Sequence, residues 1–127
     1  MDAARLTSIP LFADLPADEI ASISTFSEER SVPDGTRIVR EGDFSDQLSV
    51  IEEGTAEVRH GDEVVASLGP GDVFGEAGVL GRSMRNADVV ATSPLRLVTL
   101  THWDVKRVPT AAQRMRELAE RRAAAGS

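Results

Sequence analysis

The stretch FGEAGVLGRSMR, residues 74–85, combines features that seldom occur together. Glycines bracket Glu76, an apolar run follows, and Arg85 arrives nine residues after the glutamate in a chain that is acidic overall. If a strand ends at Phe74, the residues from Gly75 to Gly81 fit a helical turn. The first backbone N–H groups of such a turn lack internal partners and carry partial positive charge. They therefore form a cradle for an anion.

The side chains around this turn indicate what kind of anion it would hold. Gly75 and Gly78 lack the side chains that would keep a ligand away from the backbone. The Glu76 carboxylate only accepts hydrogen bonds, so it suits a hydroxyl beside the anion. Arg85 can reach back from the next strand with up to five donors. The residues thus predict a site for a compact ligand with one phosphate and one sugar hydroxyl; the alternative is an Arg85–Glu76 ion pair that needs no ligand.

Length and composition narrow the class of protein. The chain has 127 residues and a mass of 13.6 kDa, which predicts one domain over residues 1–127. Its 14 Lys and Arg against 21 Asp and Glu give a net charge of −7, which disfavours nucleic acids and anionic membranes as partners. It contains no cysteine and no apolar run of ~18 residues, and we do not expect its polar start, MDAARLTS, to act as a signal peptide. We expect a cytoplasmic domain that does not insert into membranes.

The middle of the chain has the pattern of a β protein. Nine of the ten glycines fall between Gly35 and Gly81, and turn signals such as PDG, EEG and GPGD separate short β-branched segments. This spacing favours an antiparallel sandwich or barrel over a parallel sheet. The predicted strands are TRIVR (36–40), QLSVI (47–51), TAEVRH (55–60), EVVASL (63–68), GDVF (71–74), NADVVAT (86–92) and LRLVTL (95–100).

Both flanks of this middle region predict helices. LPADEIASISTF, residues 15–26, carries apolar residues about one helical turn apart, with acidic residues near its start. After Pro109 the chain is rich in Ala, Arg and Glu, and one face of the predicted helix carries Ala111, Met115, Leu118 and Arg122.

With these surroundings, the stretch resembles the phosphate-binding cassette of cyclic nucleotide-binding domains. That pattern is Phe-Gly-Glu, an apolar run, and then Arg-Ala-Ala-(Thr or Ser)-Val. The residues that match it are Phe74, Gly75, Glu76, Arg85 at the family's spacing, Ala87 and Val89. Gly35, Gly42 and Gly54 and the lead-in IPLFADLPADEI (9–20) are also similar to the family, in the family's order.

The resemblance implies a mainly β fold. It would be an antiparallel eight-stranded β-roll, like a jelly-roll barrel, with N-terminal helices, a short phosphate-cassette helix and a C-terminal lid helix. The expected bounds are 6–26 for the N-terminal helical segment, 27–107 for the roll with its cassette at 74–89, and 109–124 for the C-terminal helix.

The resemblance also implies roles for individual residues. Arg85 would hold the cyclic phosphate, and Glu76 would accept a hydrogen bond from the ribose 2′-hydroxyl. The implied binding set is Phe74, Gly75, Glu76, Ala77, Gly78, Arg85, Asn86 and Ala87. Met115, Leu118 and Arg122 are candidates to cap the base, although core packing is the plainer explanation for the first two.

Several residues depart from the family pattern. Gly78 and Asn86 replace other small or apolar residues, and Met84 stands where proline is common. Asp88 stands where Thr or Ser is frequent, a position from which a side chain can touch the base. Two orientations stay open: Asp88 points into the pocket as a base contact, or it points outward as a solvated charge, which we favour.

The expected function is a regulatory sensor that binds cAMP or cGMP without turnover and signals through its C-terminal helix to an effector domain or partner protein. Catalytic residues, metal ligands and a further cofactor are not expected, because His60 and His102 are too few for a cupin-like metal site and no nucleophile motif occurs. The alternative is a degenerate β-roll that has lost nucleotide binding and serves in protein interaction or dimerisation. Asp88, Asn86 and Gly78 favour that alternative.

Overall fold

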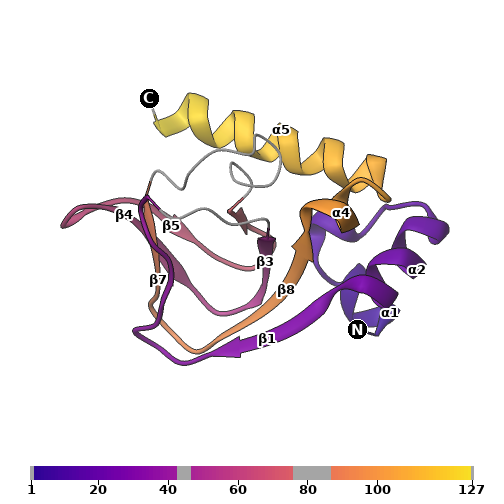
Figure 1. Ribbon diagram of the computed structural model, residues 1–127, viewed down its shortest axis with the longest axis horizontal. Coiled ribbons are helices and arrows are strands. Elements are labelled where there is room, and N and C mark those ends of the chain that lie inside the picture. Colours follow the sequence, from indigo (N-terminus) through magenta and orange to yellow (C-terminus); the bar gives the residue numbers. More distant parts are fainter. Residues whose placement is uncertain (1, 43–46, 76–86, 127) are drawn as a thin grey trace.

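The computed structural model describes residues 2–42, 47–75 and 87–126, with the backbone alone for Ala119 and residues 121–126. Within these residues, eight strands form two four-stranded antiparallel sheets, with helices before and after them (Figure 1). This architecture confirms the predicted fold class, a mainly β roll with flanking helices. Apart from Gly75, the predicted cassette helix lies outside the described residues.

Three short helices precede the sheets: α1 (Ala3–Thr7), the 3-10 helix η1 (Pro10–Phe12) and α2 (Ala17–Phe26). The Asp2 side chain caps α1 by accepting a hydrogen bond from the Ala4 amide at 2.7 Å. Helix α2 begins directly after Pro16 and carries acidic residues in its first turn, where the helix dipole favours them. The helical segment therefore begins at Ala3, before the predicted start at residue 6.

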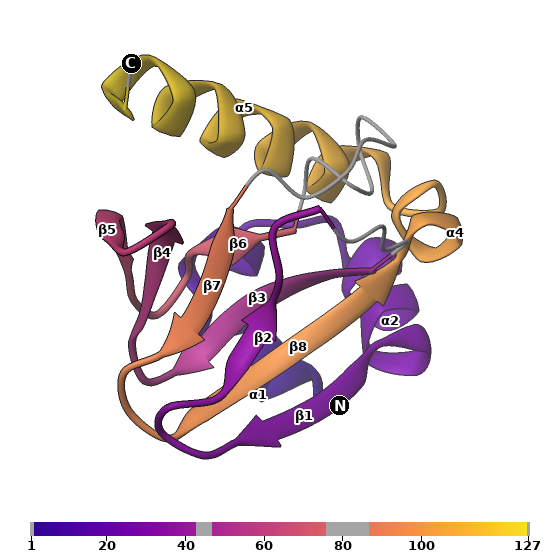
Figure 2. The same cartoon turned by 60° about the vertical axis from the view of Figure 1, so that its left-hand side comes forward.

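Consecutive strands lie in different sheets, except that β4 and β5 are neighbours in the second sheet. The first sheet has the order β1-β8-β3-β6 and the second the order β2-β7-β4-β5. The bounds are β1 (Glu28–Val32), β2 (Arg37–Val39), β3 (Gln47–Glu53), β4 (Ala56–His60), β5 (Glu63–Leu68), β6 (Val73–Phe74), β7 (Asp88–Ala91) and β8 (Leu95–Thr101). Figure 2 shows helix α5 crossing one end of both sheets.

One strand was not predicted. The sequence of β1, EERSV, is charged, and its first four residues are exposed while Val32 is buried. It becomes a strand because β8 pairs with it from Glu28 opposite Thr99 to Val32 opposite Leu95. Tertiary pairing thus overrides a weak local pattern.

Apolar side chains pack in two layers, because successive strand residues face opposite sides of a sheet. On β8, Leu97 faces the interior of the roll and Val98 faces the helices. The roll interior holds Val32, Ile51, Ala56, Leu68, Phe74, Val89, Ala91, Leu95 and Leu97. The helical layer holds Leu6, Ile9, Phe12, Leu15, Ile20, Ile23, Leu48, Val50, Val73, Val98, Leu100, Val105, Val108, Ala111, Ala112 and Met115.

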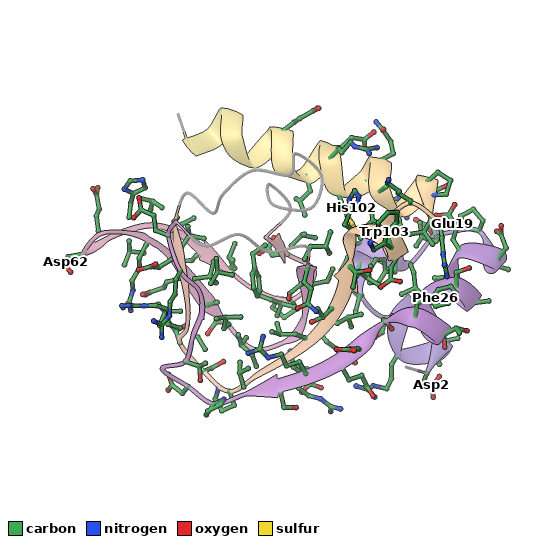
Figure 3. The ribbon with its side chains drawn as sticks, in the orientation of Figure 1. Asp2, Glu19, Phe26, Asp62, His102 and Trp103 are labelled. Atoms are coloured by element: carbon green, nitrogen blue, oxygen red, sulfur yellow. The ribbon has the colours of Figure 1, made fainter. Side chains whose placement is uncertain are left out.

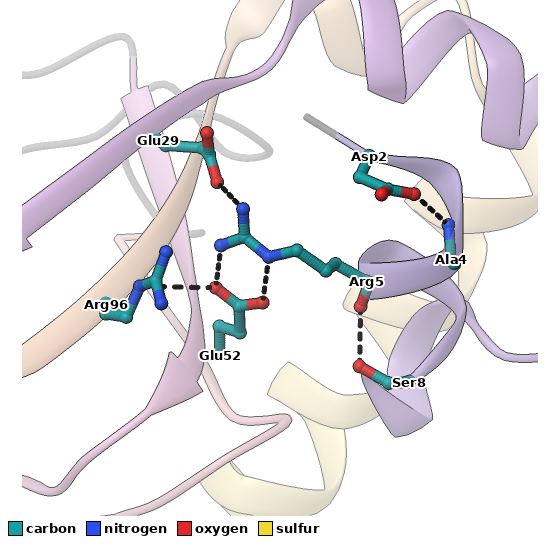
Figure 4. Close-up of polar contacts among 7 residues, drawn as sticks. All are labelled: Asp2, Ala4, Arg5, Ser8, Glu29, Glu52 and Arg96. Atoms are coloured by element: carbon teal, nitrogen blue, oxygen red, sulfur yellow. Dashed lines mark hydrogen bonds and ion pairs between the residues drawn. The ribbon is translucent and has the colours of Figure 1, made fainter.

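An ion-pair network fastens α1 to the first sheet (Figure 4). Arg5 donates to both carboxylate oxygens of Glu52, from Nη2 at 2.7 Å and from Nε at 3.1 Å. The same guanidinium pairs with Glu29 of β1, and Arg96 Nε lies 3.8 Å from a Glu52 oxygen. The carboxylates of Glu52 and Glu29 thus both bind the Arg5 guanidinium, and this fixes the position of α1 against the strands.

The chain ends in two helices, α4 (His102–Val105) and α5 (Pro109–Gly126). Thr101 and Asp104 form a capping box at the start of α4. His102 and Trp103 lie in α4, the segment that leads to the last helix, and Trp103 is 64% exposed (Figure 3). The predicted C-terminal helix, 109–124, is two residues shorter than α5.

Candidate functional site

The two ends of the predicted cassette lie on different sheets. Phe74 is on β6 of the first sheet, opposite Ser49 of β3, and its buried ring is part of the roll interior. The chain returns at Asp88, the first residue of β7 in the second sheet. Val89, which follows, belongs to the same interior cluster as Phe74. Both ends of the connection are therefore anchored in one core.

Gly75 needs to be a glycine for a conformational reason. Its φ is 84°, in the left-handed region that residues with a Cβ rarely adopt. The chain turns there as it leaves β6. This agrees with the expectation that Gly75 is a turn residue, whichever function the turn serves.

The centre of the predicted site lies outside the described residues. This applies to Glu76, Ala77, Gly78, Arg85 and Asn86. Their roles in holding a phosphate and a ribose stay predictions, as does the alternative Arg85–Glu76 ion pair. Of the predicted binding set, the structure describes Phe74, Gly75 and Ala87, the last as a half-buried residue directly before β7.

The structure shows where Asp88 points. Its Oδ1 accepts a hydrogen bond from the Glu41 amide at 2.7 Å, and its Oδ2 lies 3.7 Å from Arg37 Nε of β2. On β7 it faces opposite to Val89, whose side chain lies in the roll interior. Asp88 therefore lies outward, as favoured from the sequence, but with two partners and a side chain only 17% exposed rather than as a solvated charge.

The candidates on α5 fall in different places. Met115 is fully buried in the helical layer, and Leu118 packs against the same layer while partly buried. Both positions agree with core packing, the plainer explanation given above. Arg122 lies where the backbone alone is described, so its capping role stays a prediction.

The base of α5 is held by a buried carboxylate from α2. Glu19 is 5% exposed, and its two oxygens accept hydrogen bonds from the Thr110 amide at 3.2 Å and the Ala111 amide at 3.0 Å. Figure 3 places Glu19 between α2 and the start of α5. Arg114, one turn further on, donates to the backbone carbonyls of Leu11 and Asp14, both at 3.3 Å. The first turns of α5 are thus tied to the N-terminal helices.

A buried polar pair adjoins Phe74 on the roll interior. Ser49 and Thr99 are direct cross-strand partners, and by alternation they face the same side as Ile51 and Leu97. Their hydroxyl oxygens are 3.4 Å apart, which is long for an O–H···O bond. Ser49 of β3 is opposite Thr99 of β8 on one side and opposite Phe74 of β6 on the other. Two weakly bonded hydroxyl groups therefore lie beside Phe74, the residue at which the predicted cassette begins.

The described part of the chain contains neither a metal-binding cluster nor a membrane-spanning helix. Among residues 2–42, 47–75 and 87–126, no group of three or more His, Asp or Glu side chains is placed to hold a metal ion. Within the same ranges, no helix is both long enough and apolar enough to cross a membrane.

Comparison with known proteins identifies the family. Residues 29–109, more than half of the chain, match the family model described as the cyclic nucleotide-binding domain. The chain belongs to the cyclic nucleotide-binding domain family. The matched span includes both described ends of the cassette, so the resemblance drawn from the sequence is confirmed.

Three relatives illustrate the likeness of this cyclic nucleotide-binding domain to known proteins. The cAMP-dependent protein kinase regulatory subunit of Mycosarcoma maydis is 38% identical over 105 residues, 76% of this chain and 20% of the subunit. The regulatory domain of Toxoplasma gondii PKA, solved with cAMP, is 26% identical with a TM-score of 0.75, over 84% of this chain and 44% of that one. The regulatory subunit of a cAMP-independent protein kinase A from Trypanosoma brucei is 26% identical with a TM-score of 0.82, over 92% and 44%.

The domain accounts for only part of such proteins. It spans less than a third of the length of each of the curated relatives considered, which include kinase regulatory subunits, a potassium channel protein and a glutaminase. The family model describes a binding domain, whereas the enzymatic activity in some relatives belongs to longer chains.

Sequence reasoning about this cyclic nucleotide-binding domain missed Glu19 and the Ser49–Thr99 pair. The sequence pattern places Glu19 only among the acidic residues of a helix N-terminus, and its hydrogen-bond partners lie 91 and 92 residues away in the sequence. A period-2 reading of QLSVI and LRLVTL places Ser49 and Thr99 on one face of each strand. It does not show that the two strands are neighbours, which is known only from the sheet order.

Glu19 makes the stability of the domain depend on pH. Burial raises the pKa of its carboxyl group, but hydrogen bonds from the Thr110 hydroxyl and the Thr110 and Ala111 amides, helped by Arg114, lower it below the ordinary 4.5. A lowered pKa contributes stability above pH 4.5 that is lost as the pH falls through the folded-state value. We expect the thermal midpoint of the wild type to fall more steeply below pH 4.5 than that of Glu19→Gln. If the thermal midpoints of the two proteins fall equally steeply with decreasing pH, this expectation is wrong.

Proposed function

We propose that this domain binds a cyclic nucleoside monophosphate, cAMP or cGMP, without turning it over. The single observation that carries the proposal is the family match over residues 29–109, because that span contains the Phe-Gly-Glu sequence and an arginine nine residues after the glutamate. The left-handed Gly75 and the shared core of Phe74 and Val89 support a turn at this point of the roll.

In the proposed complex, each group has a distinct electrostatic task. Backbone amides after Gly75 and the Arg85 guanidinium neutralise the cyclic phosphate, and charge-assisted bonds of this kind are the strongest hydrogen bonds in proteins. Glu76 accepts from the ribose 2′-hydroxyl. An acidic protein can hold an anion in this way because both kinds of donor are local, whereas its net charge of −7 is spread over the surface.

The choice of nucleotide has to be decided by experiment. The Toxoplasma gondii regulatory domain was solved with cAMP, yet the similar Trypanosoma brucei subunit belongs to a kinase described as cAMP-independent. Similarity of fold among these regulatory domains therefore does not decide the ligand. The carboxylate of Asp88 is held by Glu41 and Arg37, so it is turned away from the role of a base contact.

Signalling would follow from a change in helix α5. Bound nucleotide favours one position of the part of α5 that crosses the end of the roll, and a partner protein or an effector domain reads that position. The helix has the length and placement for this, since it extends from α4 across the end of both sheets (Figure 1).

Calorimetric titration with cAMP and with cGMP tests the proposal directly. We expect saturable binding of at least one of them at micromolar concentration, with no release of linear nucleotide. If neither nucleotide binds below millimolar concentration, the degenerate interaction module becomes the better description. The outward position of Asp88 removes one of the three sequence features that favoured that alternative.

The orientation of Asp88 leads to a specific expectation for Asp88→Asn. The asparagine oxygen can still accept from the Glu41 amide. The ion pair that is lost is long, at 3.7 Å, and the Arg37 side chain is 52% exposed, so the pair is worth only about 0–1 kcal/mol. We therefore expect nucleotide affinity to change less than about fivefold by calorimetry. Asp62→Asn, at the exposed tip of the β4–β5 hairpin, is the matched control (Figure 3). A loss of tenfold or more in Asp88→Asn alone would place the carboxylate at the ligand.

A further inference from the structure

Helix α5 begins with donors that need partners. The first N–H groups of any α-helix have no carbonyl within the helix to bond, and they are costly to leave unpaired when buried. Here one carboxylate accepts two of them, Thr110 on Oε2 and Ala111 on Oε1. Because Glu19 comes from α2, this cap is also a link between the beginning and the end of the chain.

The base of α5 has two further attachments. Arg114 reaches the carbonyls of Leu11 in η1 and of Asp14. On the neighbouring face, Ala111, Ala112 and Met115 are buried in the helical layer together with Phe12 and other residues of the N-terminal helices. Three independent contacts therefore fix residues 109–115 to α2 and η1.

These contacts restrict how a ligand can act on the helix. A ligand shifts a conformational equilibrium only by the ratio of its affinities for the two states, typically about 5–150-fold. Detaching the base of α5 would exchange the hydrogen bonds of Glu19 for hydrogen bonds to water and would expose the side chains of Ala111, Ala112 and Met115, which are buried in the helical layer. The loss of this apolar burial opposes detachment, so a ligand acts more readily on the later turns of the helix than on its base.

We propose that Glu19 is a positioning residue that keeps the base of α5 on α2 in both the free and the nucleotide-bound state, so that the response of α5 to ligand begins beyond Met115. The proposal rests on the proposed function, because it concerns how nucleotide binding reaches the helix. The C-terminal helix therefore does not move as a whole: the first two turns of α5 serve as a fixed base and only the later turns move.

Amide hydrogen exchange measured residue by residue by NMR tests the link. In the free protein, the Thr110 and Ala111 amides should be protected, and Glu19→Gln should speed their exchange at least about tenfold, because glutamine offers one acceptor oxygen where two amides need one each. The Val98 amide in β8 reports global unfolding. The informative quantity is the rate at Thr110 and Ala111 divided by the rate at Val98, since a merely destabilised protein raises both rates together.

Asp18→Asn is the matched control, because Asp18 precedes Glu19 in the same turn of α2 and is exposed. It should leave the ratio unchanged. If Glu19→Gln does not fold, Arg114→Ala removes a different attachment of the same base and should raise the ratio, whereas exposed Arg116→Ala should not. An unchanged ratio in Glu19→Gln, or in Arg114→Ala where that variant replaces it, overturns the proposal.

The second arm adds saturating cAMP or cGMP, whichever binds in calorimetry, to the wild type. We expect unchanged exchange at Thr110 and Ala111 and altered exchange only beyond Met115. Faster exchange at Thr110 and Ala111 on adding nucleotide would show that the link opens and would overturn the proposal. The two failures can be told apart: absence of binding in calorimetry removes the proposed function and the ligand response with it, whereas the free-protein arm tests the Glu19 link without any nucleotide.

Discussion

Replacing Arg85 with alanine is expected to weaken cyclic nucleotide binding about 100-fold or more. The guanidinium is the one cationic side chain assigned to the phosphate by the family pattern, and the substitution removes its charge-assisted hydrogen bonds. A 100-fold loss corresponds to about 2.7 kcal/mol, within the range for one or two hydrogen bonds to a charged group. Calorimetric titration of Arg85→Ala beside the wild type measures it, with Arg116→Ala, an exposed arginine on α5, as the control.

The same experiment separates ligand binding from the structural alternative. If Arg85 only pairs with Glu76, then Arg85→Ala and Glu76→Gln should lower the thermal midpoint while leaving nucleotide affinity unchanged. If Arg85 holds the phosphate, Arg85→Lys should retain part of the affinity, because lysine keeps the charge but not the forked pair of donors. Unchanged affinity in Arg85→Ala would remove this residue from the site.

Replacing Met115 with alanine is expected to destabilise the fold by about 2–5 kcal/mol, the usual cost of truncating a fully buried methionine. Met115 lies in the helical layer with the N-terminal helices, where the surrounding helices and sheet limit how far the core can close the cavity. Chemical denaturation monitored by circular dichroism gives the free energy of unfolding. Arg116→Ala, the next residue along α5, should change it by less than about 0.5 kcal/mol.

Nucleotide affinity in the same variant distinguishes core packing from base capping. Measured well below the thermal midpoint, where the protein is folded, the affinity of Met115→Ala should remain within about threefold of the wild type. The opposite pattern, near-normal stability with affinity reduced tenfold or more, would show that Met115 contacts the base and leaves its buried position when ligand is bound.

Local patterns predicted most of the elements. EVVASL coincides with β5, and six further segments correspond to β2, β3, β4, β6, β7 and β8, because period-2 alternation and turn residues are properties of neighbouring residues in the chain. The pattern failed at β1, whose EERSV sequence has no apolar alternation, and it missed the early start of α1 at Ala3.

For the candidate site, the sequence predicted which residue types stand at the cassette and at what spacing, and the family match agrees with that pattern. The need for glycine at position 75 could also be anticipated from a turn after a strand. The partners of Asp88 could not be predicted, because Glu41 and Arg37 reach it only when β2 lies beside β7. Orientation across strands depends on sheet order, which one sequence does not display.

The sequence by itself determined the family, the β-rich class and the chemistry available to a ligand, since these depend on residue identity and short-range spacing. The tertiary structure alone decided that Asp88 faces outward, that Met115 belongs to the core, and that Glu19 holds the start of α5. The physical reason is the same in each case. A buried charge or an apolar side chain is assigned its partner by packing between segments distant in the chain, and Glu19 meets Ala111 across 92 residues.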